Sequence, residues 1–144
     1  MRQAIDSLLA QSFEDFELII CDNASTDATE SVCRGYVEAD NRIRYFRNDR
    51  NIGLQANFDK VLDLATGPYF MWAGHDDLWD PSYISRMVDV LDRRDSVVLA
   101  GSNAASVDQD GKLRKYVDNV PPYSPTSTYA RAKRLICAPP GGLH

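Results

Sequence analysis

The sequence predicts an α/β fold, with an open, mostly parallel sheet that carries helices on both faces. Two features of the sequence predict it. Short, continuous apolar runs such as FELIIC (residues 16–21) and YFMWA (residues 69–73) have the length and composition of strands buried on both faces. Longer segments with apolar residues every three to four positions alternate with these runs, and that spacing is typical of amphipathic helices. Strands that alternate with helices favour a parallel sheet.

The first third of the chain contains two predicted helices and two predicted strands. Residues 2–11 have helical spacing, and the FELIIC strand follows them. A second helix is expected to begin near Thr26 or Asp27, either of which can cap it while Glu30 reaches back. Residues 43–46 alternate apolar and basic side chains, as a strand with one solvated face does. We expect the arginines in and beside this strand to be a solvated face more readily than a phosphate clamp: Arg42, Arg44, Arg47 and Arg50.

The middle of the chain continues the alternation. Residues 54–65 keep a helical apolar stripe, and the YFMWA strand follows a Thr-Gly-Pro break. A further helix is expected to begin at Pro81, because proline is favoured in the first turn. Residues 96–100 (SVVLA) read as another strand.

The pattern weakens toward the end of the sequence. We expect one domain over residues 1–144, with an irregular C-terminal segment over residues 102–144. Within this segment, Asp-Gln-Asp-Gly at 108–111 predicts a hairpin turn that leads into a strand over 112–117. A short helix is expected over 127–136.

Composition excludes several classes of protein. The net charge of −5 and pI near 4.9 argue against a nucleic-acid-binding protein, which would carry a basic face. No apolar run approaches the roughly 20 residues that a membrane-spanning helix needs, and no signal peptide opens the chain. The three cysteines lack metal or redox spacing and read as reduced apolar residues. We therefore expect a cytoplasmic protein with no transmembrane segment.

Two polar clusters follow predicted strands. Asp22-Asn23-Ala24-Ser25 comes after FELIIC, and His75-Asp76-Asp77 comes after YFMWA. Because ligands of open α/β sheets bind beyond the carboxyl ends of the strands, we expect the two clusters to face one site. The loop over residues 48–53 follows the predicted strand that lies between the two clusters in sequence, and this loop can contribute to the same site.

Each candidate residue also has a structural interpretation. Two adjacent carboxylates at the end of a buried strand favour a Mg²⁺ or Mn²⁺ ion, but Asp76 or Asp77 can equally cap the helix near Pro81. Asp22 can equally close a turn onto Ser25 or Thr26. His75 favours a hydrogen-bonding role over a metal-ligand role. Asn51 and Gly53 favour a helix-entry turn, with a backbone contact to a ligand as the lesser alternative.

Taken together, these motifs resemble the donor-binding half of the family-two glycosyltransferases, which are inverting enzymes of the Rossmann-like GT-A fold. FELIICDNASTD resembles that family's strand and turn, commonly written E-L-I-I-V-D-D-G-S-T-D. RYFRNDRNIGLQANFDKVLDLATGPYFMWAGHDDLWDP resembles the next block, which runs from an N-x-G turn to the D-x-D region. The ordered motifs, from about Ala4 to Ala100, make the resemblance specific.

The resemblance implies a function and a set of roles. Asp22 would contact the nucleotide base, Asp76 would lie near the ribose, and Asp77 would bind the Mn²⁺ or Mg²⁺ that bridges the two phosphates. The full assignment gives metal binding to Asp77 and nucleotide binding to Asp22, Asn23, Ser25, Asn51, Gly53 and Asp76. The reaction would transfer a sugar from a UDP-, dTDP- or GDP-linked donor to the hydroxyl of a glycan acceptor, in polysaccharide or cell-surface glycan synthesis.

Three departures from the family pattern qualify these roles. Gly74 replaces an acidic residue, and Asn23 replaces a common second Asp. The family's first strand, typically V-S-V-I-I-P-T-Y-N, and its catalytic base have no counterpart here, so the chain resembles an incomplete domain. We therefore expect low stability and a tendency to form a homo-oligomer. Two alternatives stay open, a nucleotide-sugar and metal-binding fragment without activity and a structural α/β module. Peripheral association with the inner face of the plasma membrane is compatible with this interpretation.

Overall fold

The computed structural model of the chain describes residues 1–108 and 111–117. Although the sequence predicts a single domain, the backbone divides into two compact units, Met1–Val88 and the part from Asp89 onward. All of the predicted site residues lie in the first unit.

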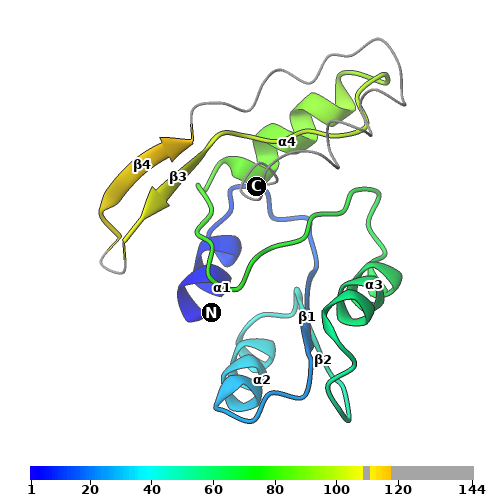
Figure 1. Cartoon of the computed structure of the whole chain (residues 1–144). Helices are drawn as coiled ribbons and strands as arrows, with labels where there is room; N and C mark the ends of the chain where they lie inside the picture. The colour runs from blue at the N-terminus through cyan, green and yellow to red at the C-terminus, as the bar shows by residue number, and fades with distance from the viewer. Residues whose placement is uncertain (109–110, 118–144) are drawn as a thin grey trace. The chain divides into compact units, whose positions relative to one another are not determined.

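The first unit is an α/β structure. Its elements, in order, are α1 (Arg2–Leu9), β1 (Leu18–Asp22), α2 (Thr29–Ala39), β2 (Ile43–Arg47), α3 (Leu54–Leu64) and the beginning of α4 (Tyr83–Asp92). Strands β1 and β2 pair in parallel, with Leu18 opposite Ile43 and Asp22 opposite Arg47. Figure 1 shows α2 and α3 on opposite sides of the two strands. The predicted α/β class, with a parallel sheet and helices on both faces, is confirmed.

The buried apolar residues of the first unit come from α1, α2 and β2. Helix α1 buries one face, as its helical spacing predicts: Ala4, Ile5 and Leu8. Cys33 of α2 and Ile43 of β2 are also buried, and Cys33 is fully enclosed. The interpretation of the cysteines as apolar residues fits Cys33, whose thiol pKa is raised by burial.

A buried glutamine joins α1 to the start of α4. The Gln11 side-chain amide donates hydrogen bonds to the carbonyls of Ser7 (3.2 Å) and Asp80 (2.7 Å). Its Oε1 accepts from the Ile84 backbone N–H at 2.9 Å. Because Gln11 is buried and each bond satisfies a backbone group, this side chain anchors the loop before α4 onto α1.

Glu17 connects the entry of β1 to the end of α3. Its Oε1 accepts hydrogen bonds from the Thr66 backbone N–H and hydroxyl, both at 2.7 Å. Its Oε2 pairs with Arg44 Nη1 at 2.6 Å. The hydrogen bonds from Thr66 and then from Arg44 lower the pKa of Glu17 from 4.5 to about 2.

We expect this lowered pKa to make the first unit acid-sensitive in a defined window. The unfolded chain binds a proton at Glu17 more readily, so the stabilising contribution is complete above pH 4.5 and is lost as the pH falls toward about 2. A carboxyl NMR titration of Glu17 should have its midpoint near 2. In Glu17→Gln the slope of unfolding free energy against pH should flatten in this window. A titration midpoint near 4.5 for Glu17 would contradict the hydrogen bonds and the ion pair described for this side chain.

Two predicted strands are absent. Residues 69–73 and 96–100 are irregular. An apolar run predicts burial but cannot supply the strand partner that its N–H and C=O groups need. Among the described residues, β1 pairs only with β2, so 69–73 joins no ladder, and Trp72 remains 50% exposed. Val98, at 81% exposed, shows that 96–100 lacks the cover that a strand buried on both faces requires.

The second unit contains an antiparallel hairpin. Strands β3 (Ala104–Val107) and β4 (Leu113–Val117) pair, and Gly111, with φ of 79°, lies in the turn between them. The predicted turn and the strand that follows it are confirmed, whereas β3 was missed. The rest of the predicted irregular segment, including the helix expected over 127–136, lies outside the described residues. None of the helices in the described part of the chain is long and apolar enough to cross a membrane.

Candidate functional site

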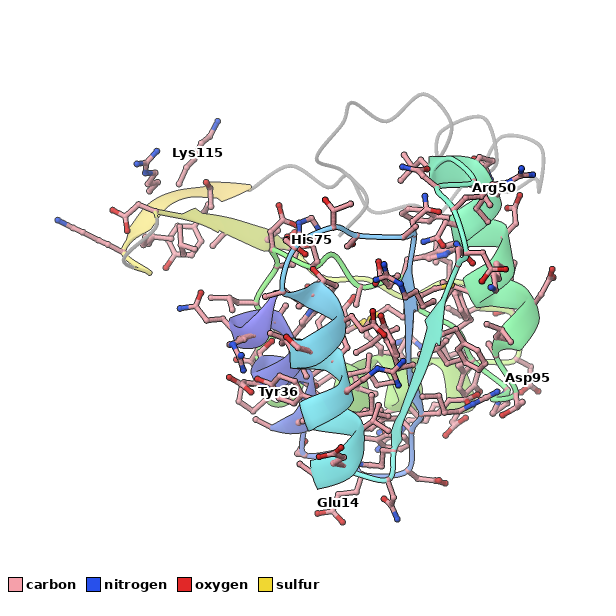
Figure 2. The ribbon with its side chains drawn as sticks, turned by 90° about the horizontal axis from the view of Figure 1, so that it is seen from below. Glu14, Tyr36, Arg50, His75, Asp95 and Lys115 are labelled. Atoms are coloured by element: carbon pink, nitrogen blue, oxygen red, sulfur yellow. The ribbon has the colours of Figure 1, made fainter. Side chains whose placement is uncertain are left out.

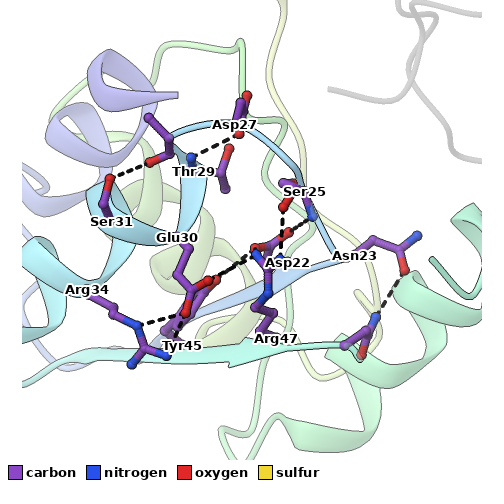
Figure 3. A network of polar contacts seen from close by, with 12 residues as sticks. Asp22, Asn23, Ser25, Asp27, Thr29, Glu30, Ser31, Arg34, Tyr45 and Arg47 are labelled. Carbon is purple, nitrogen blue, oxygen red and sulfur yellow. Dashed lines mark hydrogen bonds and ion pairs between the residues drawn. The ribbon is translucent and has the colours of Figure 1, made fainter. Parts of the chain in front are cut away.

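Asp22 ends β1 and is enclosed by hydrogen-bond donors (Figure 3). Its side chain is fully buried, at 0% exposed. Oδ1 accepts from the Ser25 backbone N–H at 2.7 Å. Oδ2 accepts from the Tyr45 hydroxyl at 2.8 Å and pairs with Arg47 Nη1 at 2.7 Å. The turn onto Ser25 that the structural interpretation of Asp22 predicted is therefore present.

These contacts keep Asp22 ionised. Burial by itself raises the pKa of this carboxyl, but the hydrogen bonds from Ser25 and Tyr45 and the charge of Arg47 outweigh it, so the pKa lies below its ordinary value. Burial and the hydrogen bond to Asp22 raise the pKa of Tyr45 to about 12, so the phenol remains a hydrogen-bond donor. Asp22 is thus a fixed negative charge at the carboxyl end of β1.

Asn23 connects the end of β1 to the turn before α3. Its Oδ1 accepts from the Ile52 N–H at 2.9 Å, and its Nδ2 donates to Asn51 Oδ1 at 2.9 Å. Asn51 Oδ1 also accepts from the Gly53 N–H at 2.8 Å, and Gly53 has a φ of 88°, which favours glycine. The helix-entry turn predicted at Asn51 and Gly53 is confirmed.

Asn48, which the sequence patterns did not single out, joins these groups. It is buried, and its backbone N–H donates to the Asp22 carbonyl at 2.9 Å. Its Nδ2 donates to Asn23 Oδ1 (3.1 Å) and Asn57 Oδ1 (2.8 Å), and its Oδ1 accepts from Lys60 Nζ at 2.6 Å. The signal that could have found it was position, because Asn48 is the first residue after β2, as Asn23 is after β1.

The basic residues of β2 are engaged rather than solvated. Arg47 Nη1 also lies 3.3 Å from Glu30 Oε2, and Glu30 pairs with Arg34 at 2.8 Å. Glu30 therefore binds arginines and does not reach back to the cap of α2, where Asp27 accepts from Thr29. Two further arginines pair with carboxylates near the beginning of β2: Arg42 with Asp40 (2.7 Å) and Arg44 with Glu17 (2.6 Å). The expectation of a solvated basic face therefore holds for Arg50, which is exposed, whereas the other three arginines pair with acidic residues.

A hollow of about 570 Å³ opens beside this network. It is lined by Arg47, Asn48, Asp49, Arg50, Ile52 and Lys60. Its volume lies within the range of small-molecule sites. The hollow borders the turn that holds Asn51 and Gly53.

The carboxylate pair lies in an exposed loop. His75 and Asp76 are 81% and 79% exposed, and His75 Nδ1 lies 3.9 Å from Asp76 Oδ1 (Figure 2 labels His75). Because residues 69–73 form no strand, the expected position of the pair at the end of a buried strand was wrong. The capping alternative does not describe the start of α4 either, since Asp80 Oδ1 accepts the hydrogen bonds of Ser82.

The loop explains the glycine at position 74. A Cβ at Gly74 would collide with Asp77 Oδ2, and the Asp77 N–H approaches the Gly74 carbonyl at 3.4 Å in a tight turn. The Asp77 carboxylate therefore occupies the space into which a side chain at 74 would extend. Gly74 and the orientation of Asp77 are coupled.

The residues present fit a metal that keeps an open coordination sphere. Within residues 1–108 and 111–117, no group of three His, Cys, Asp or Glu side chains could enclose an ion. Asp76 is exposed and Asp77 is half-buried, and their adjacent carboxylates are hard oxygen ligands of the kind that Mg²⁺ or Mn²⁺ would accept. Five predicted site residues take part in the hydrogen bonds described above: Asp22, Asn23, Ser25, Asn51 and Gly53. Asp76 lies outside that network.

Comparisons with known proteins agree with the motifs. Residues 1–140 match the family described as glycosyl transferase family 2. A protein of Rickettsia felis named as an uncharacterized glycosyltransferase is 33% identical over 81% of this chain and 19% of its own length. Similarly named proteins of Rickettsia typhi and Methanocaldococcus jannaschii are 35% identical (70% of this chain, 31% of theirs) and 26% identical (80% and 40%). The chain therefore spans between about one fifth and two fifths of these relatives.

Proposed function

The chain belongs to glycosyl transferase family 2, and from this premise we propose that it binds the donor of a glycosyltransferase. The donor is a nucleotide-diphosphate sugar, and the acceptor is a glycan hydroxyl. One observation carries the proposal. The polar residues that follow β1 and β2 form one hydrogen-bonded network, centred on Asn23 and Asn48. A site at the carboxyl ends of adjacent parallel strands is where open α/β sheets bind nucleotides.

We assign each site residue a role in binding the donor. Asp22 is assigned to the base, and Asn23, with the turn at Asn51 and Gly53, would position backbone groups beside the nucleoside. Ser25 fixes Asp22 by its backbone N–H. Asp76 is assigned to the ribose and Asp77 to the metal.

A bound Mg²⁺ or Mn²⁺ would supply the positive charge that stabilises a diphosphate leaving group. The chain's own residues would bind and orient the donor, and Asp77, packed against Gly74, would hold the ion. Transfer of a hexose in polysaccharide or cell-surface glycan synthesis, in the cytoplasm or at the inner face of the plasma membrane, is the setting we propose.

Calorimetric titration of the 144-residue chain tests the proposal. UDP, dTDP and GDP are titrated in turn, with Mn²⁺ and with EDTA. We expect at least one nucleoside diphosphate to bind, and to bind more tightly with Mn²⁺. Absence of binding by all three would overturn the proposal and favour a structural α/β module. Hydrolysis or transfer from the corresponding nucleotide-sugar then separates an enzyme from a binding module without activity.

A further inference from the structure

Three basic residues line the hollow beside α3: Arg47, Arg50 and Lys60. Of its basic residues, Arg47 is already paired with Asp22 and Glu30. Within the described residues, neither Arg50 nor Lys60 forms an ion pair. In a chain of net charge −5, two free positive charges at one concave surface call for an anionic partner.

Lys60 is held in position without losing its charge. Its ammonium donates to Asn48 Oδ1 at 2.6 Å, and Asn48 is itself fixed by hydrogen bonds to Asn23 and Asn57. An amide oxygen orients an ammonium but carries no negative charge to offset it. Because an ammonium has three donors, two remain for a ligand. Lys60 is thus a preorganised cation.

Arg50 and Asp49 complete the charge balance of the hollow. Arg50 is exposed and lies near the first turn of α3 (Figure 2). Asp49 also lines the hollow and opposes an anion, so the free cations outnumber this carboxylate by two to one. Ile52 adds an apolar wall.

We propose that Lys60 and Arg50 form a metal-independent subsite for a phosphate group of the donor nucleotide. The inference rests on the proposed function, because Asn48 and Ile52 join the hollow to the residues assigned to the nucleoside. Charge-assisted hydrogen bonds from lysine and arginine are the usual way in which proteins hold phosphate oxygens. This subsite adds affinity that does not depend on Asp77.

Inorganic pyrophosphate in EDTA is the probe, because it lacks a base and the solution lacks a metal. We expect calorimetry to show binding to the 144-residue chain, weakened about tenfold in both Lys60→Met and Arg50→Gln. Lys60→Arg keeps the charge and should retain most of the affinity. Arg86→Gln, which removes an arginine that does not line the hollow, is the matched control and should bind as the parent does. Circular dichroism confirms that each variant is folded.

The outcomes separate this inference from the proposed function. No pyrophosphate binding in EDTA, or equal losses in Arg50→Gln and Arg86→Gln, would overturn the phosphate subsite even if nucleotides bind with Mn²⁺. Competition identifies the source of the phosphate. Displacement of pyrophosphate by the nucleoside diphosphate that binds supports a donor subsite, whereas simultaneous binding of both would refute it.

Discussion

Asp22→Ala should destabilise the first unit by about 2–3 kcal/mol. The substitution leaves the Ser25 N–H, the Tyr45 hydroxyl and Arg47 without their common acceptor. Removing one partner of a buried ion pair costs more than the pair contributed, because the remaining charge stays partly desolvated. The Arg47 side chain is one third exposed, so water can partly solvate its charge after the substitution. The loss of stability is therefore smaller than it would be for a fully buried pair. Urea unfolding followed by circular dichroism measures the effect.

Asp27→Ala provides the matched control. Asp27 lies in the same connection between β1 and α2, is exposed, and accepts a hydrogen bond from the Thr29 N–H. Its loss should destabilise the first unit much less than the loss of Asp22, because water can replace an exposed hydrogen bond to the Thr29 N–H. If Asp22→Ala and Asp27→Ala unfolded at the same urea concentration, the Asp22 network would contribute no more stability than the exposed Asp27 hydrogen bond.

The pH dependence gives the same prediction a second readout. The pKa of Asp22 is lowered in the folded chain, so unfolded molecules bind its proton more readily. Its contribution is complete above the unfolded pKa of 3.8 and is lost as the pH falls through the folded value. The stability difference between the parent and Asp22→Ala should therefore be largest near neutral pH and shrink on acidification. A difference that grew toward low pH would contradict the assignment.

This network also bears on how a base would reach Asp22. Both carboxylate oxygens of Asp22 already accept hydrogen bonds from other groups of the protein, and its side chain has no exposed surface. A base can hydrogen-bond to Asp22 only where it replaces the Tyr45 hydroxyl or an Arg47 N–H. Nucleotide binding and the stability of the first unit are therefore coupled through the same carboxylate. We expect the bound nucleotide to change the environment of Tyr45.

Local sequence signals were sufficient for the β1–α2–β2–α3 region. Apolar spacing and the turn at Gly53 are encoded within a few residues, so helices and strands here follow from neighbouring positions. The run at 69–73 failed because a strand also needs a partner, and that depends on segments distant in sequence. Its aromatic residues pack on each other and on α3 instead, with Phe70 and Phe58 both against Trp72.

The candidate site was only partly predictable from the sequence, for a related reason. Asp22, Asn23 and Asn51 were identifiable because they directly follow strands or open a helix. The roles of Tyr45 and Arg47 depend on register, since pairing places Asp22 opposite Arg47, and residues two apart in a strand share a face. A single sequence does not fix that register. Lys60 likewise meets Asn48 only because α3 folds back against the end of β2.

Asp77→Ala should weaken the Mn²⁺-dependent binding of a nucleoside diphosphate by roughly 100-fold. In the proposed site, the ion would be held by the carboxylates of one turn, since the described residues contain no cluster of three metal ligands. Losing a supporting residue of a metal site commonly costs about 10–100-fold in affinity, and a direct ligand lies at or above the upper end. Calorimetry with and without Mn²⁺ measures the loss. Affinity in EDTA should be unchanged, since the phosphate subsite at Lys60 and Arg50 does not involve Asp77.

Asp15→Ala is the appropriate comparison, because Glu14 and Asp15 form another adjacent acidic pair and have no assigned role. It should leave Mn²⁺-dependent binding unchanged. Gly74→Ala tests the geometry separately, because its new Cβ would displace the Asp77 carboxylate without removing it, and an intermediate loss of Mn²⁺ dependence should result. If nucleotide binding ignored Mn²⁺ and survived Asp77→Ala, the turn would not be a metal site. The assignment of Asp77 to the metal would then be wrong.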